Sequence, residues 1–109
     1  MKEEQKIINK IIKIAKEKKG FNIKKYSNKR LTYFANYIII IECFNMQHCR
    51  ALCDEILLKL KEENYKVENI DGTYQTEWVI LDYGNIFVNI LTSKKREYYQ
   101  LDELFQKIK

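Results

Sequence analysis

The sequence predicts an α/β fold in which a mixed β-sheet carries helices on both faces. Segments with apolar residues at helical spacing alternate with short extended apolar segments along the chain. A chain of 109 residues is too short for two independent cores, so we expect one domain over residues 1–109. Proline is absent and only three glycines occur, which excludes long flexible linkers.

The first third predicts a helix followed by two strands. Residues 3–19 have an amphipathic pattern, and Gly20 is placed to cap the carboxyl end of that helix. Its apolar stripe is Ile7, Ile8, Ile11, Ile12, Ile14 and Ala15. Residues 21–26 alternate apolar and polar side chains, as in a strand with one solvated face. Residues 37–41 are apolar on both faces, which predicts a central strand covered on both sides.

The rest of the chain predicts a crossover unit, a hairpin and a last helix. Asn45 is placed to cap a helix that runs to about residue 64, and residues 67–70 resume extended structure. A strand, a helix and a second strand in this order predict two parallel strands with a right-handed connection. Gly84-Asn85 between residues 77–83 and 86–91 predicts a tight hairpin. Thr92 or Ser93 then caps a final helix that reaches Ile108.

Charge is unevenly distributed along the chain. Residues 1–30 hold eleven Lys and Arg against three acids, a net charge of +8, whereas residues 31–109 have a net charge of −3. The basic end could contact phosphates, or it could be the solvated face of a lysine-rich helix. We find no apolar run long enough to cross a bilayer and no signal-peptide or transit-peptide pattern. An odd, clustered number of cysteines favours a reducing compartment, so we expect a cytoplasmic protein without a membrane partner.

Candidate catalytic and metal-binding residues are few. Cys43, His48, Cys49 and Cys53 lie close in sequence, but Cys49 and Cys53 fall on the apolar stripe of the expected helix and His48 points elsewhere. We therefore expect buried cysteines that pack as small apolar residues, and no metal. The chain has no glycine-rich phosphate loop, and Asp82 stands alone where two-metal chemistry needs paired carboxylates. The sequence predicts neither an enzyme nor a cofactor.

Aromatic and arginine residues in the last third predict a partner-binding surface. Trp, Tyr and Arg are the residue types enriched at protein–protein hot spots. On the strand over residues 77–83, alternation places Trp78 and Asp82 on one face and Leu81 on the core side. The expected contact residues are Trp78, Asp82, Tyr83, Arg96 and Tyr99. The alternative is that Arg96 pairs internally with Asp82 and only positions the last helix.

This last third also carries a family signature. The run EWVILDYGNIFV at residues 77–88 is followed by Arg96, Tyr99-Gln100-Leu101-Asp102 and Leu104-Phe105. In this order and spacing, the residues resemble the ribosomal silencing factor family, also called RsfS or Iojap. The strand at residues 37–40, the helix residues His48, Arg50-Ala51-Leu52 and Asp54, and the turn at Asp71-Gly72 are similar to the family's upstream elements. The likeness covers about residues 5–105.

The resemblance implies a nucleotidyltransferase-like α/β sandwich without catalysis. It further implies a protein that binds the fourteenth protein of the large ribosomal subunit on the intersubunit face and sterically blocks subunit joining, which represses translation. The family commonly forms homodimers, and the basic amino-terminal segment could add a peripheral contact to ribosomal RNA. The alternatives are a degenerate nucleotidyltransferase that still binds a nucleotide, and a free RNA-binding module built on residues 1–30.

The sequence departs from the family pattern at several positions. Asn36 replaces a usual Asp, Asn89 a usual His, and Phe105 a usual Trp, while Phe44 and Asn45 stand near a usual small residue and Ser. Asn36 and Asn89 remove charged groups that could contact the partner. Phe105 keeps an aromatic side chain at its position.

Overall fold

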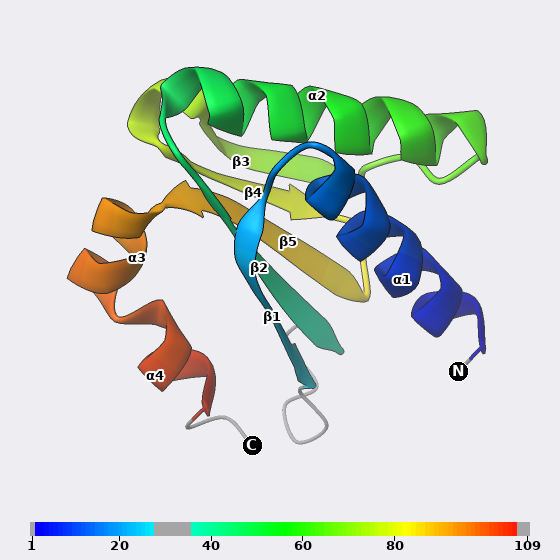
Figure 1. The fold of residues 1–109 in the computed structure, drawn as a ribbon. Helices are drawn as coiled ribbons and strands as arrows, with labels where there is room; N and C mark the ends of the chain where they lie inside the picture. The colour runs from blue at the N-terminus through cyan, green and yellow to red at the C-terminus, as the bar shows by residue number, and fades with distance from the viewer. Residues whose placement is uncertain (1, 28–35, 107–109) are drawn as a thin grey trace.

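A five-stranded β-sheet forms the centre of the molecule, with helices on both of its faces (Figure 1). The computed structural model describes residues 2–27 and 36–106. Its helices and strands, in chain order, are α1 (Lys2–Glu17), β1 (Phe21–Ser27), β2 (Tyr37–Cys43), α2 (Met46–Glu62), β3 (Asn69–Thr73), the 3₁₀ turn η1 (Tyr74–Thr76), β4 (Trp78–Asp82), β5 (Ile86–Thr92), α3 (Ser93–Tyr99) and α4 (Leu101–Gln106).

The strands lie in the order β1-β2-β5-β4-β3. β2 and β5 pair in parallel, and the other three pairs are antiparallel, so the predicted mixed sheet is confirmed. The crossover prediction is corrected in one respect. β2 and β3 run in the same direction, but β5 and β4 lie between them. Every residue of β3 is exposed whereas β5 is nearly all buried, so the apolar strand takes the central place and the polar one the edge.

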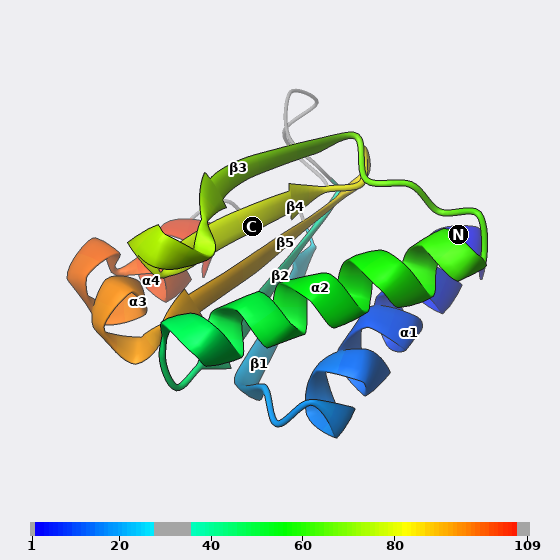
Figure 2. The same cartoon turned by 90° about the horizontal axis from the view of Figure 1, so that it is seen from above.

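The larger core lies between the sheet and the helices α1 and α2, which lie side by side across one face (Figure 2). β2 contributes Ile39 and Ile41 to this core, while Ile38 and Ile40 are buried on the opposite face. The prediction of a central strand covered on both sides is therefore confirmed. Asn45 caps α2 as predicted, because its side-chain oxygen accepts a hydrogen bond from the His48 amide at 2.9 Å.

The end of α1 differs from the prediction. Lys19, with φ of 69°, takes the left-handed conformation that was expected of Gly20. Gly20 is required for space instead. A Cβ atom at this position would lie 2.8 Å from Cγ2 of Ile41, so the turn can approach the sheet only with glycine there.

The hairpin between β4 and β5 forms as predicted. The Tyr83 amide donates to the Ile86 carbonyl at 2.9 Å, and the two residues between them make the turn. Gly84 has φ of 86°, a conformation that glycine adopts at little cost. On β4, Val79 and Leu81 are buried in the larger core, which confirms the predicted side of the hairpin that faces inward.

The expected single last helix is two short helices. Gln100 has φ of 50° and ends α3, and its amide bonds back to the carbonyls of Arg96 and Glu97. This break lets Leu101 pack onto the second face of the sheet with Ile38, Ile40 and Leu91. Thr92 is at the cap position of α3, but its hydroxyl donates to the Glu77 carboxylate and accepts no hydrogen bond from an amide of the helix, so neither predicted residue is seen to cap α3 with its side chain. Residues 107–109 lie outside the described part.

Candidate partner-binding surface

Trp78 lies on the face of β4 that is turned away from the larger core. Its indole Nε1 donates to the Asn89 side chain on β5 at 3.0 Å, and its ring packs against the smaller core beneath α4. This side chain is half-buried and held by a hydrogen bond, so its orientation is fixed before any partner arrives.

Two tyrosines of α3 extend this aromatic region. The Tyr99 ring lies 5.0 Å from the Trp78 ring between centroids, and Tyr98 meets Tyr99 edge-on at 4.8 Å. Tyr98 is 77% exposed and Tyr99 49% exposed, which is unusual for large apolar rings. We call Trp78, Ile80, Lys95, Tyr98 and Tyr99 the Trp78 surface.

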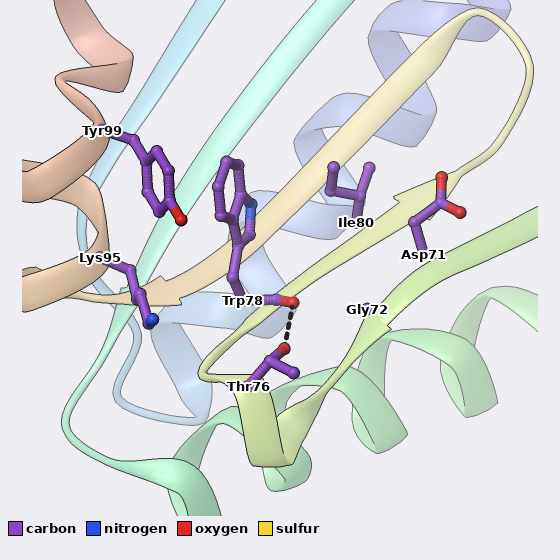
Figure 3. A pocket seen from close by; sticks show the side chains of 7 residues that line it. All are labelled: Asp71, Gly72, Thr76, Trp78, Ile80, Lys95 and Tyr99. Carbon is purple, nitrogen blue, oxygen red and sulfur yellow. Dashed lines mark hydrogen bonds between the residues drawn. The ribbon is translucent and has the colours of Figure 1, made fainter.

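A shallow hollow of about 280 Å³ opens in this surface (Figure 3). Trp78 and Tyr99 stand side by side in the close-up, with Ile80 further along β4 and Lys95 one turn before Tyr99 on α3. The hollow is lined by Asp71, Gly72, Thr76, Trp78, Ile80, Lys95 and Tyr99. It can receive an apolar side chain of a partner against the indole, with a cation and a carboxylate at its rim.

Arg96 is buried and makes its contacts inside the chain. Its Nε and Nη2 donate to the two carboxylate oxygens of Asp102 at 2.7 and 2.9 Å. Its Nη1 donates to Glu42 at 3.1 Å and to the Asn22 carbonyl at 2.6 Å. The sequence left open that Arg96 pairs with an acid inside the chain, and Asp82 was the expected acid. In the structure the acids that pair with Arg96 are Asp102 and Glu42.

The ion pair around Arg96 is fully hydrogen-bonded. Bonding to Arg96, and further to the Tyr26 hydroxyl at 2.7 Å, lowers the pKa of Asp102 to about 2. The same pairing with Asp102 raises the pKa of Arg96. Glu42, only 5% exposed, also accepts from Ser93. This network ties β1, β2, α3 and α4 together beneath the second face of the sheet.

Asp82 and Tyr83 lie away from Trp78. The Asp82 carboxylate accepts the Gly84 amide at 2.7 Å, so this acid has a structural role in the hairpin that sequence reasoning missed. Tyr83 packs against the larger core, and burial raises the pKa of its phenol to about 12. The Tyr83 hydroxyl has no hydrogen-bond partner among the described residues.

The structure therefore brings together two of the five predicted contact residues, Trp78 and Tyr99, on one surface. Arg96 comes from the same helix as Tyr99 but points inward. Sequence reasoning did not assign Tyr98 and Lys95 to this surface. The spacing held a signal for Lys95, since residues four apart on a helix share a face.

The cysteines pack as predicted. Cys43, Cys49 and Cys53 are free thiols buried in the larger core. Hydrogen bonding to Cys49, together with burial, raises the pKa of both Cys43 and Cys53. Within residues 2–27 and 36–106, no group of three or more His, Cys, Asp or Glu side chains is arranged to hold a metal ion. The described helices are also all too short or too polar to span a bilayer.

Taken together, these features define a small α/β protein whose most distinctive exposed feature is an aromatic surface beside a buried ion-pair network. The model of the family "RsfS: Ribosomal silencing factor during starvation" matches residues 1–109, and the chain belongs to this family.

Named relatives and solved structures agree with the family. The chain is 26% identical to the ribosomal silencing factor RsfS of Chromobacterium violaceum over 93% of this chain and 83% of that protein. It is 26% identical to the RsfS protein of Bacillus subtilis, over 87% of this chain and 84% of that protein. It is 27% identical to the chloroplastic protein Iojap of Zea mays, over 87% of this chain and 41% of that longer protein. A crystal structure of a Chromobacterium violaceum protein superposes with a TM-score of 0.88 at 25% identity, covering 94% of this chain and 85% of that one.

The departures from the family pattern have visible roles. Asn89 accepts the indole N–H of Trp78, and Asn45 caps α2. Asn36 donates to Glu4 at 3.2 Å, which ties the start of β2 to α1. Phe44 is 69% exposed. The Phe105 side chain lies outside the described part.

Proposed function

We propose that this protein is a ribosomal silencing factor that binds the large ribosomal subunit and prevents the small subunit from joining it. Membership of the silencing-factor family supports the general function. The observation that carries the binding site is the Trp78 surface, where a half-buried, hydrogen-bonded indole lies beside two exposed tyrosines. Aromatic residues fixed before binding are the side chains that most often dominate interface energies.

The proposed partner is the fourteenth protein of the large subunit, on the intersubunit face. Ribosomal proteins are commonly basic, and residues 31–109, which carry the Trp78 surface, have a net charge of −3. Asp71 at the rim of the hollow offers a carboxylate to a basic side chain, while the apolar hollow accepts its stem.

The proposed mechanism is steric and involves no bond chemistry. The described part of the molecule extends 33 × 33 × 21 Å. A body of this size on the intersubunit face fills space that the small subunit must enter. The protein then represses translation in the cytoplasm by occupancy alone, without a cofactor or a catalytic residue.

Two further contacts belong to this proposal. The basic amino-terminal segment rests on ribosomal RNA, where its lysines meet phosphates. In the absence of the ribosome the protein forms a homodimer, since no other strand among the described residues pairs with the outer edges of β1 and β3.

Co-sedimentation with separated ribosomal subunits tests the proposal. We expect the protein to pellet with the large subunit and to keep the two subunits apart when both are present. Trp78→Ala and Tyr99→Ala should each weaken binding by about 2 kcal/mol or more, roughly thirtyfold. Leu58→Ala, which removes a side chain that is 52% exposed on α2, is the matched control and should bind normally. A protein that stays in the supernatant at both low and moderate salt would refute large-subunit binding.

A further inference from the structure

A second aromatic cluster lies at the end of β2, outside the Trp78 surface. Phe44 is 69% exposed, its ring lies 4.6 Å from that of Phe21, and it stacks on His48 at 5.0 Å with 21° between the planes. We call Phe21, Phe44 and His48 the Phe44 cluster. Single exposed apolar residues are common, but Phe44 packs against two other rings, so the three form an aromatic group at the surface.

Hydrogen bonds hold the His48 ring of the cluster in place. His48 Nδ1 accepts the Phe44 amide at 2.9 Å, and Nε2 lies 2.8 Å from the Lys18 carbonyl. With Nδ1 as the acceptor, Nε2 is the ring nitrogen that can donate to the Lys18 carbonyl. Both ring nitrogens are thus engaged, and the ring plane on which Phe44 stacks is fixed. Pairing of Phe21 with Glu42 brings the third ring alongside.

Residues 16–25, the segment that contains Phe21 of the cluster, are strongly basic. The end of α1 and the strand β1 carry the exposed lysines Lys16, Lys18, Lys19, Lys24 and Lys25, against one acid, Glu17, over residues 16–25. The start of α2 adds polar residues and has no acid in its first turn. A protein hot spot is normally ringed by further packed side chains that exclude water. A flat exposed ring that packs against Phe21 of this lysine-rich segment instead fits a stacked base whose neighbouring phosphates meet lysines.

We propose that the Phe44 cluster binds single-stranded RNA by stacking one unpaired base on the exposed face of Phe44. An unpaired base is required because bases inside a helix already have both faces covered. The lysines of α1 and β1 bind the adjoining phosphates without reading sequence.

The cluster is suitably placed to act together with the Trp78 surface. Cys43, next to Phe44, pairs with Thr92, and Trp78 pairs with Leu91, so both surfaces border the same end of the sheet. This inference rests on the proposed function only for the source of the RNA, which would be an unpaired segment of ribosomal RNA next to the bound ribosomal protein.

Fluorescence anisotropy with a labelled unstructured RNA of ten nucleotides tests the inference. We expect the protein to bind this strand and to bind a duplex of the same sequence more weakly. Phe44→Ala should weaken binding about tenfold or more, Phe44→Tyr should retain it, and Leu58→Ala should change nothing. Lys18→Glu with Lys19→Glu should flatten the dependence on salt, whereas Phe44→Ala should leave that slope unchanged.

Other outcomes would overturn the proposal. They are equal binding by Phe44→Ala and the unaltered protein, full retention by Phe44→Leu, or equal affinity for the duplex. Binding of the isolated fourteenth ribosomal protein separates the two proposals: Trp78→Ala should lose it and Phe44→Ala should keep it. If Phe44→Ala loses protein binding instead, the cluster is a protein contact and the RNA assignment is wrong. If the unaltered protein binds RNA but no large subunit, the RNA site stands and the silencing proposal fails.

Discussion

Replacing Arg96 with methionine should remove a large part of the stability of the fold. The side chains of Arg96 and Glu42 are 10% and 7% exposed, and the guanidinium serves Glu42, Asp102 and the Asn22 carbonyl at once. Removing one partner of a buried ion pair costs about 3–5 kcal/mol, because the remaining charge is left without compensation. Domains of this size have about 5–15 kcal/mol in total. We therefore expect Arg96→Met to lower the melting temperature by about 15 °C.

Urea unfolding followed by circular dichroism measures this loss, and a compensating variant tests its cause. Arg96→Met combined with Glu42→Gln and Asp102→Asn removes the stranded charges, so it should be more stable than Arg96→Met alone. A cost below about 1 kcal/mol for Arg96→Met, or a triple variant no better than the single one, would refute the reasoning. By the same reasoning, Arg96→Glu should unfold the protein, so lost ribosome binding in that variant would not report on the interface.

Three further outcomes are expected. The pKa of Asp102 is lowered from 3.8 to about 2, so the pairing of its carboxylate stabilises the fold above pH 4, and this stabilisation is lost as the pH falls through 2. The pairing contributes about 1–2 kcal/mol to the free energy of unfolding after allowance for partial exposure. In Asp102→Asn, the free energy of unfolding should therefore depend less on pH in this range. Gly72→Ala should destabilise by about 2 kcal/mol or more in thermal unfolding, because φ is +78° and the new Cβ would lie 2.3 Å from the Trp78 carbonyl oxygen; stability equal to that of Thr73→Ala would contradict this. Light scattering at micromolar concentration should find dimers, and only 13.2 kDa species would contradict self-association.

Structural features that depend on residues close together in the chain could be predicted from the sequence. Gly84-Asn85 specifies the hairpin because a two-residue turn needs a positive φ, and glycine supplies it. The isoleucines of β2 specify a central strand because no other position buries both faces. Asn45 specifies the start of α2 because its oxygen bonds the helix from outside.

Structural features that depend on contacts between residues far apart in the chain could not be predicted from local sequence patterns. The position of β3 at the edge depends on competition with β5 for the place beside β2. The break at Gln100 depends on Leu101 reaching the sheet and Asp102 reaching Arg96, contacts that no local pattern encodes. The same holds for the residues expected to contact a partner. Strand alternation predicts the face on which Trp78 lies, whereas the inward position of Arg96 depends on Glu42, 54 positions earlier.

The pairing of β2 with β5 has a consequence for how the chain folds. Tyr37 pairs with Ile86 and Cys43 with Thr92, so every partner lies 49 positions away. As the polypeptide leaves the ribosome, the isoleucine-rich β2 can pair with β1 at once but must wait for β5 along its other edge. An apolar strand with an open edge is prone to join another chain. Nascent chains that stall before β5 emerges are therefore the species most prone to aggregation.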